Sequence, residues 1–165
     1  MTLNELMDGF TPNANYEGAI TNDDFVIAIN TGESSTDVGD YVVAQAGIVS
    51  IVTALTPISQ TKSYMREGQS TVKTATQRTF AITGDRIVGD EFQEYVLSTD
   101  NLYGIGQNVI TDYVRFCLKN GKGEKGKVSI IVNADGSGNT NEPAAIDVSL
   151  QKVGATPEVY TWTVV

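Results

Sequence analysis

The chain has 165 residues, which fits one domain with a real core, and it carries 41% hydrophobic residues and a net charge of −9. It contains no histidine, so mechanisms that need an imidazole are excluded, and its single cysteine, Cys117, cannot form an internal disulfide. The acidic balance argues against a surface that grips nucleic acid, because such a surface needs a basic footprint.

The sequence predicts no membrane segment and no secretory signal. Its apolar runs are shorter than the ~18 residues of a membrane span, and Met1–Phe10 lacks a positive region followed by an apolar one. Leu3, Leu6, Met7 and Phe10 fall at helical spacing and predict a short amphipathic turn. We interpret residues 1–22 as an N-terminal arm or irregular lead-in, with a frayed terminus as the alternative.

The first half of the chain predicts strands separated by polar turns. Phe25–Ile29 is a strand of buried character, and Thr31–Gly39 is a polar loop. Tyr41–Leu55 is rich in β-branched residues and predicts one or two strands, with Gly47 as a bend or bulge. Pro57 is then expected to interrupt the strand.

A long hairpin is expected next. Ser59–Met65 alternates weakly and buries little, Arg66–Ser70 predicts a turn, and Thr74–Arg86 returns as a strand. Phe80 and Ile82 define the core face of this strand. The opposite face is small or polar, and it carries Gln77, Thr79, Ala81, Thr83 and Asp85.

One short helix follows, from Asp90 to Leu97. Asp90 can cap it, and Glu91 is favourable in its first turn. An apolar stripe of Phe92, Tyr95 and Val96 gives it a side to bury. Thr99–Gly106 is predicted to be a loop.

The C-terminal part again predicts strands. Val109–Leu118 fits either a helix or a strand, and the β-rich setting favours a strand. The glycine-rich tract 120–126 predicts a hairpin turn, and Ala134–Glu142 predicts a loop. The expected strands are Lys127–Asn133, Ala145–Val153 and Val159–Val165. Short strands at regular spacing suggest a sandwich or barrel.

The motifs that could carry chemistry are weak. Gly121–Lys127 nearly spells a phosphate loop, but Val128 stands where Ser or Thr is needed, and a strand follows instead of a helix. The tract 133–139 lacks the spaced carboxylates and closing Glu of a calcium loop. Cys117 has no histidine to activate it, so we expect a buried thiol. We therefore expect no enzyme, no metal and no cofactor.

The stretch Thr71–Ser98, TVKTATQRTFAITGDRIVGDEFQEYVLS, resembles the centre of the siphophage-type major tail tube proteins. The resemblance implies one domain over residues 1–165 with a mainly β fold: a barrel-like β-sandwich, one short flanking α-helix and a long extended hairpin. It implies a structural virion protein in the tail, assembled in the host bacterial cytoplasm as stacked hexameric rings. The implied partners are further copies of the chain, the tail tip or initiator, the tape measure and the tail terminator proteins.

The resemblance also implies two sets of functional residues. Double-stranded DNA would pass through the tube without specific binding, which acidic or neutral lumen side chains favour because they repel phosphates. Our candidate lumen residues are Gln77, Thr79, Thr83, Asp85, Asp147 and Ser149. Our candidates for an inter-subunit arm are Ser59, Thr61, Lys62, Tyr64, Met65, Arg66 and Gly68.

Two other functions stay open at this stage. One is the inner tube of a contractile particle or bacteriocin, which the sequence does not separate from a siphophage tube. The other is a monomeric β-sandwich module that binds carbohydrate or a cell surface, for which exposed aromatics around a cleft are expected. We also expect Leu55–Thr74 to become a strand pair only on assembly, because it buries too little to offset the ~1–2 kcal/mol per residue lost on ordering a backbone.

Overall fold

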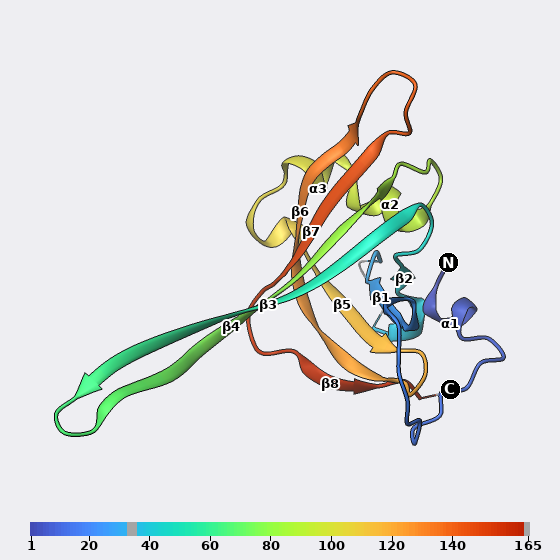
Figure 1. Cartoon of the computed structure of the whole chain (residues 1–165). Helices are drawn as coiled ribbons and strands as arrows, with labels where there is room; N and C mark the ends of the chain where they lie inside the picture. The colour runs from blue at the N-terminus through green and yellow to red at the C-terminus, as the bar shows by residue number, and fades with distance from the viewer. Residues whose placement is uncertain (33–35, 164–165) are drawn as a thin grey trace.

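The structure is a computed structural model that describes residues 1–32 and 36–163. Its centre is one antiparallel sheet with the strand order β2-β1-β5-β6-β7-β4-β3, and β8 pairs with β6 beside this path (Figure 1). The strands are β1 (Phe25–Ile29), β2 (Val42–Val43), β3 (Ile48–Tyr64), β4 (Gly68–Asp85), β5 (Ile110–Cys117), β6 (Lys122–Ser137), β7 (Ala145–Lys152) and β8 (Glu158–Thr161). The helices are α1 (Leu3–Leu6), α2 (Glu91–Val96) and α3 (Thr99–Tyr103), with 3-10 turns η1 (Asn22–Asp24), η2 (Val38–Asp40) and η3 (Gly106–Val109). The mainly β fold with a short flanking helix and a long hairpin is confirmed.

The sheet curls toward a barrel. Phe80 of β4 and Tyr113 of β5 belong to strands that are not neighbours in the sheet, yet their ring centroids lie 5.3 Å apart across the interior. Asn22, just before β1, donates from Nδ2 to the carbonyl oxygen of Ile51 in β3 at 3.4 Å. The two ends of the strand order therefore approach each other, and the barrel-like form of the prediction describes the fold better than two stacked sheets.

β1 and β5 are buried on both faces. Ile27 and Ile29 of β1 point into the main core, whereas Val26 and Ala28 pack in a second cluster with α1 and the C-terminal aromatics. In that second cluster the rings of Phe116 and Trp162 stack at 5.7 Å. This two-sided burial explains the uninterrupted apolar run of β1, which a one-sided strand would not need.

The N-terminus is part of this packing. Leu3 is completely buried and Met7 nearly so, and α1 confirms the predicted helical turn, but Phe10 lies beyond the helix and is exposed. The amide of Leu3 donates to the carbonyl oxygen of Tyr41 at 2.9 Å, and the amide of Val43 donates to that of Met1 at 3.0 Å. Residues 1–7 therefore belong to the domain body. The prediction of an N-terminal arm or irregular lead-in still applies to residues 8–22.

The predicted helix is confirmed as α2. Asp90 accepts a hydrogen bond from the amide of Gln93 at 3.1 Å and caps the helix, while Phe92 and Val96 are buried in the main core. Gln93 itself is 1% exposed. Its side chain accepts from the amide of Ile87 at 2.8 Å and donates to two carbonyl oxygens, of Ala46 and of Asp85, at 2.9 Å each. One amide thus ties the helix to the turn before β3 and to the last residue of β4, at the end of the hairpin farthest from its tip.

Three element predictions were wrong in whole or in part. Pro57 lies inside β3, opposite Thr76, because β3 is an edge strand and does not need the missing amide. The tract 120–126 turns only at its start, where Gly121 has φ +71 and its amide donates to the carbonyl oxygen of Cys117 at 2.8 Å. From Lys122 the tract is strand β6, and a Cβ on Gly123 would come within 1.9 Å of the carbonyl oxygen of Arg115. The missing side chain of Gly123 lets β5 and β6 approach closely. β6 then continues to Ser137, through the first part of the loop predicted for residues 134–142.

The remaining differences are smaller. The predicted loop Thr99–Gly106 contains helix α3. The last strand ends at Thr161, and residues 164–165 of the prediction lie outside the described residues, as do residues 33–35 of the predicted loop. Gly47 forms the predicted bend, with φ +71. Cys117 is buried, as expected.

Candidate assembly surfaces

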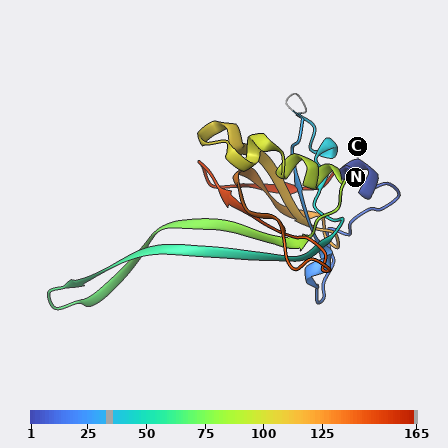
Figure 2. The same cartoon turned by 90° about the horizontal axis from the view of Figure 1, so that it is seen from above.

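The most prominent feature of the molecule is the outer part of the β3–β4 hairpin, which we call the arm (residues 54–75). It projects far from the body as an isolated strand pair, which Figure 2 shows from above. Every residue of the arm is exposed. All of the predicted arm residues lie on it: Ser59, Thr61, Lys62, Tyr64, Met65, Arg66 and Gly68. The two strands pair within one chain as far as Tyr64 and Gly68, so the expectation that pairing awaits assembly is not what the structure shows.

The arm exposes apolar side chains that nothing in its own chain covers. Ile58, Tyr64 and Val72 fall on one face by the register and are 54%, 50% and 59% exposed. Leu55, on the other face, is 61% exposed. Further out on that face, the hydroxyls of Thr61 and Thr71 lie 2.9 Å apart. An extended element with apolar groups on two faces is typical of a segment that is buried against another molecule.

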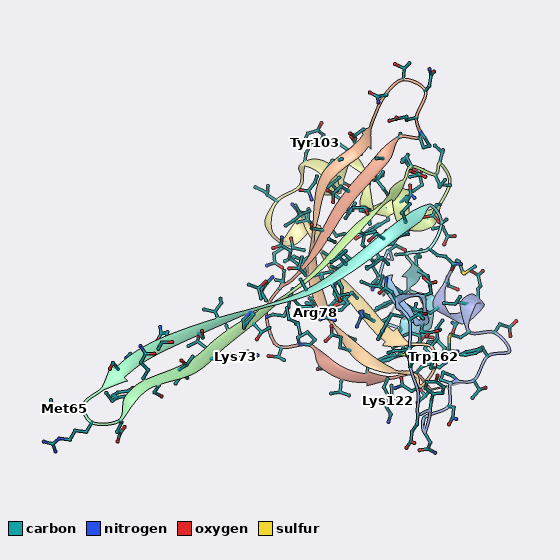
Figure 3. All side chains as sticks on the ribbon, in the orientation of Figure 1. Met65, Lys73, Arg78, Tyr103, Lys122 and Trp162 are labelled. Atoms are coloured by element: carbon teal, nitrogen blue, oxygen red, sulfur yellow. The ribbon has the colours of Figure 1, made fainter. Side chains whose placement is uncertain are left out.

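The arm is anchored at its root by a polar cluster that sequence reasoning missed. Arg78 of β4 places Nε 3.0 Å from Glu124 Oε1 of β6, and the hydroxyl of Tyr113 in β5 donates to the same oxygen at 3.3 Å. Burial raises the pKa of Tyr113, and the neighbouring Glu124 carboxylate raises it further. Figure 3 shows Arg78 where the arm meets the body. The cluster joins three strands at this point.

The candidate lumen residues share one face of the sheet. Thr83 pairs with Asp147, and Thr79 pairs with Gln151, so these β4 and β7 side chains point to the side opposite the buried Phe80 and Leu150. All six candidates, Gln77, Thr79, Thr83, Asp85, Asp147 and Ser149, are partly exposed there. Their common face is what the period of two predicted, and their role as a lumen lining stays a prediction.

The register extends this face over two more strands. Ala81 pairs with Val52 of β3 on one side and with Ser149 of β7 on the other, and Ser149 pairs with Ile131 of β6. The four strand segments 50–54, 79–85, 129–134 and 145–151 contain Asp85 and Asp147 but no Lys or Arg. Val52 and Ile131 could not be assigned to this face from the sequence, because only cross-strand pairing places them on it.

Two further observations concern metal binding and membrane-spanning helices. The described residues hold no group of three or more His, Cys, Asp or Glu side chains that could bind a metal ion. No helix within the described ranges combines the length and apolar character needed to cross a membrane.

The fold has relatives among solved structures. A chain in the tail of an empty gene transfer agent particle, solved with helical refinement and C6 symmetry, aligns with a TM-score of 0.57 and 13% identity, over 88% of this chain and all of that one. This chain therefore shares the fold of a chain in the tail of a gene transfer agent particle. A chain in the virion of a native gene transfer agent particle aligns with the same TM-score and coverage at 11% identity. No family model and no curated protein matches the sequence.

Proposed function

We propose that this chain is the major tail tube subunit of a long-tailed phage, which polymerises as stacked hexameric rings into a hollow tube. The observation that carries this proposal is the arm: an isolated hairpin with apolar side chains exposed on both faces, on a body whose fold matches a tail protein. An exposed strand pair of this length needs a partner to bury it, and copies of the same chain supply one in a polymer.

The edges of the sheet support ring formation. β3 has no strand partner on its outer side, and β6 beyond Ser129 has none on the side away from β7 among the described residues. The four-stranded segment β3-β4-β7-β6 therefore presents two unlike edges. Contacts between unlike edges are heterologous, and they close into a ring when the rotation between neighbours allows it. Six copies in a ring would match the symmetry of the tail to which the fold is similar.

The shared face of β4 and β7 suits a channel for DNA. Duplex DNA carries one negative charge per about 1.7 Å of its axis, so a basic lining would hold it. The face carries two carboxylates and no cation over the four segments named above. We infer that it lines the bore, and that DNA passes without specific binding. The tail tip, tape measure and terminator proteins would complete the assembly.

The alternatives differ in what they require. The inner tube of a contractile particle needs the same subunit geometry, and a neighbouring sheath gene would distinguish it from a siphophage tube. A carbohydrate module needs aromatics around a cleft. The exposed aromatics Phe10, Tyr16, Tyr64 and Tyr103 are spread over several elements, and none lines the grooves beside β1, β5 or the arm.

Light scattering on concentrated protein, alone and with the tail-tip complex, tests the proposal. The matched variant replaces Lys62–Ser70 by Asn-Gly, a pair that closes a tight hairpin. We expect the full chain to form large particles, and the variant to keep the circular dichroism spectrum of the body but to stay monomeric. Persistent monomers of the full chain under both conditions would contradict the proposed function.

A further inference from the structure

Charge is divided unevenly along this chain. Residues 1–61 contain eight Asp and Glu and no Lys or Arg, whereas residues 62–165 contain twelve acidic and eleven basic residues. The eight acids all fall within residues 5–40, and α1 and β1 in this stretch lie at the end of the body away from the arm (Figure 1). The arm carries Lys62, Arg66 and Lys73 against one acid, Glu67. That end of the body therefore has more acids than bases, since Arg115, Lys119 and Lys122 also lie there, and the projecting arm has more bases than acids.

The acidic end contains an apolar groove. It has a volume of about 310 Å³ and lies between β1, β2 and the start of β3. Its apolar walls include Leu6, Phe25, Val43, Ile48, Val49 and Ile51. Val49 is 76% exposed, so the groove opens to solvent.

A free carboxylate stands in this groove. Asp23 is one of its lining residues, is exposed, and has no hydrogen bond or ion pair within the described part of the chain. Its neighbour Asp24 differs, because it accepts a hydrogen bond from the amide of Thr21 at 2.8 Å. The groove thus offers an apolar floor with one uncompensated negative charge at its rim.

The arm tip has the complementary chemistry. Met65 is 86% exposed at the end of the hairpin (Figure 3), and a flexible thioether fills irregular apolar spaces well. Arg66 follows it with φ 68, a left-handed conformation that is uncommon outside glycine, and its guanidinium has no carboxylate partner in the described residues. The turn therefore presents one apolar side chain and one free cation side by side.

The groove and the tip of one chain cannot meet. β3 lines the groove with Ile48 and Ile51 and ends at Tyr64, just before the tip. At 3.3 Å per residue the extended strand separates Ile51 from Tyr64 by roughly 40 Å. The groove must therefore receive the tip of another copy if it receives one.

We propose that Met65 of one copy inserts into the groove beside β1 of a second copy, with the Arg66 guanidinium paired to the Asp23 carboxylate. This inference rests on the proposed tube function and assigns the site that receives the arm. The contact is heterologous, so each copy that donates a tip keeps its own groove open for the next. Charge complementarity between the basic arm and the acidic end would orient the approach of the two copies.

Charge reversal tests the pairing. Arg66→Glu and Asp23→Arg should each raise the critical concentration for assembly about tenfold or more, because like charges then face each other. The double variant should recover most of this loss. Lys73→Glu makes the same charge change on the arm away from its tip, and it should have a smaller effect. Failure of the double variant to recover assembly, with both single variants folded, would overturn the pairing.

Cysteine cross-linking tests, independently of charge, whether the arm tip of one copy lies in the groove of another. Met65→Cys combined with Val49→Cys should give ladders of disulfide-linked chains on a non-reducing gel after mild oxidation of assembled protein. Each single variant should give dimers at most, and Met65→Cys with Val159→Cys, on the exposed strand β8, should give no ladder. Assembled particles without a ladder from the first pair would reject this groove while leaving the tube function intact, whereas absence of assembly in the unmodified chain would reject the tube function itself.

Discussion

At the scale of single residues, Gln93 holds helix α2 to the ends of the hairpin strands that lie in the body, away from the arm. Replacing Gln93 by Leu keeps the volume but leaves the amide of Ile87 and the carbonyl oxygens of Ala46 and Asp85 without their partner. A buried polar group left unsatisfied costs roughly 1–3 kcal/mol. We expect Gln93→Leu to lower the free energy of unfolding by about 2–3 kcal/mol in a denaturant titration of monomeric protein. Gln69→Leu, on the exposed arm, is the control and should change it little; equal effects of the two variants would contradict the role of Gln93.

Tyr113 gives the fold a defined alkaline response. Its pKa is raised, chiefly by burial, so the folded protein keeps the phenolic proton at a pH where the unfolded chain loses it. The contribution of Tyr113 to the free energy of unfolding is fully present below about pH 10, and it declines as the pH rises above that value. Tyr113→Phe should flatten the decline by up to about 1.4 kcal/mol per pH unit above pH 10, measured by urea denaturation. Tyr103→Phe, which changes an exposed ring, should keep the unmodified slope, and an unchanged slope in Tyr113→Phe would contradict the assignment.

At the scale of elements, the arm differs from the strands that it continues. β4 is buried at Phe80 and Ile82, but the same strand has both faces exposed from Gly68 to Ala75. The arm has ladder hydrogen bonds without a core, so its local opening should cost little free energy. We expect amides of Ser59–Ser70 to exchange with deuterium much faster than those of Thr79–Thr83 in the monomer, and to become protected in assembled particles. Equal protection of both segments in a verified monomer would mean that the arm is stable without partners.

The sequence predicts elements where one local signal dominates. Alternation at Phe80 and Ile82 identified the core face, and the Asp90 cap identified the start of α2. Local signals failed where their meaning depends on position in the sheet. Gly123 serves close strand approach instead of a turn, and Pro57 is tolerated because β3 is an edge. Gln93 gave no signal, since a polar side chain on a short helix normally faces water.

The assembly surfaces were predictable only where a single segment of the chain carries the signal. The arm residues could be recognised from their poverty in apolar side chains, and the two acids of the β4–β7 face from the period of two. The groove beside β1 could not, because Leu6, Phe25 and Val49 come from separate segments that only the fold brings together. The polar cluster of Arg78, Tyr113 and Glu124 was likewise hidden, as its members lie on three strands.

At the scale of the whole molecule, charge should govern passage of DNA through the tube. Replacing Asp85 and Asp147 by Lys puts two cations per subunit on the face that we assign to the bore. Because cationic side chains hold phosphates, we expect tubes of normal appearance but a phage that ejects its DNA slowly or not at all. Infectivity assays and microscopy of the same particles measure this, and Asp85→Asn with Asp147→Asn is the control that removes charge without adding any. Normal infectivity of the Lys variant would exclude these residues or the electrostatic explanation.

The polymer itself is the central claim, and electron cryo-microscopy of assembled full-length protein tests it most directly. We predict hollow tubes with six subunits in each ring, with the outer face of β3, β4, β7 and β6 lining the bore and the arm buried against other copies. Particles without a channel, or tubes in which this face points outward and the arm stays free in solvent, would contradict the account.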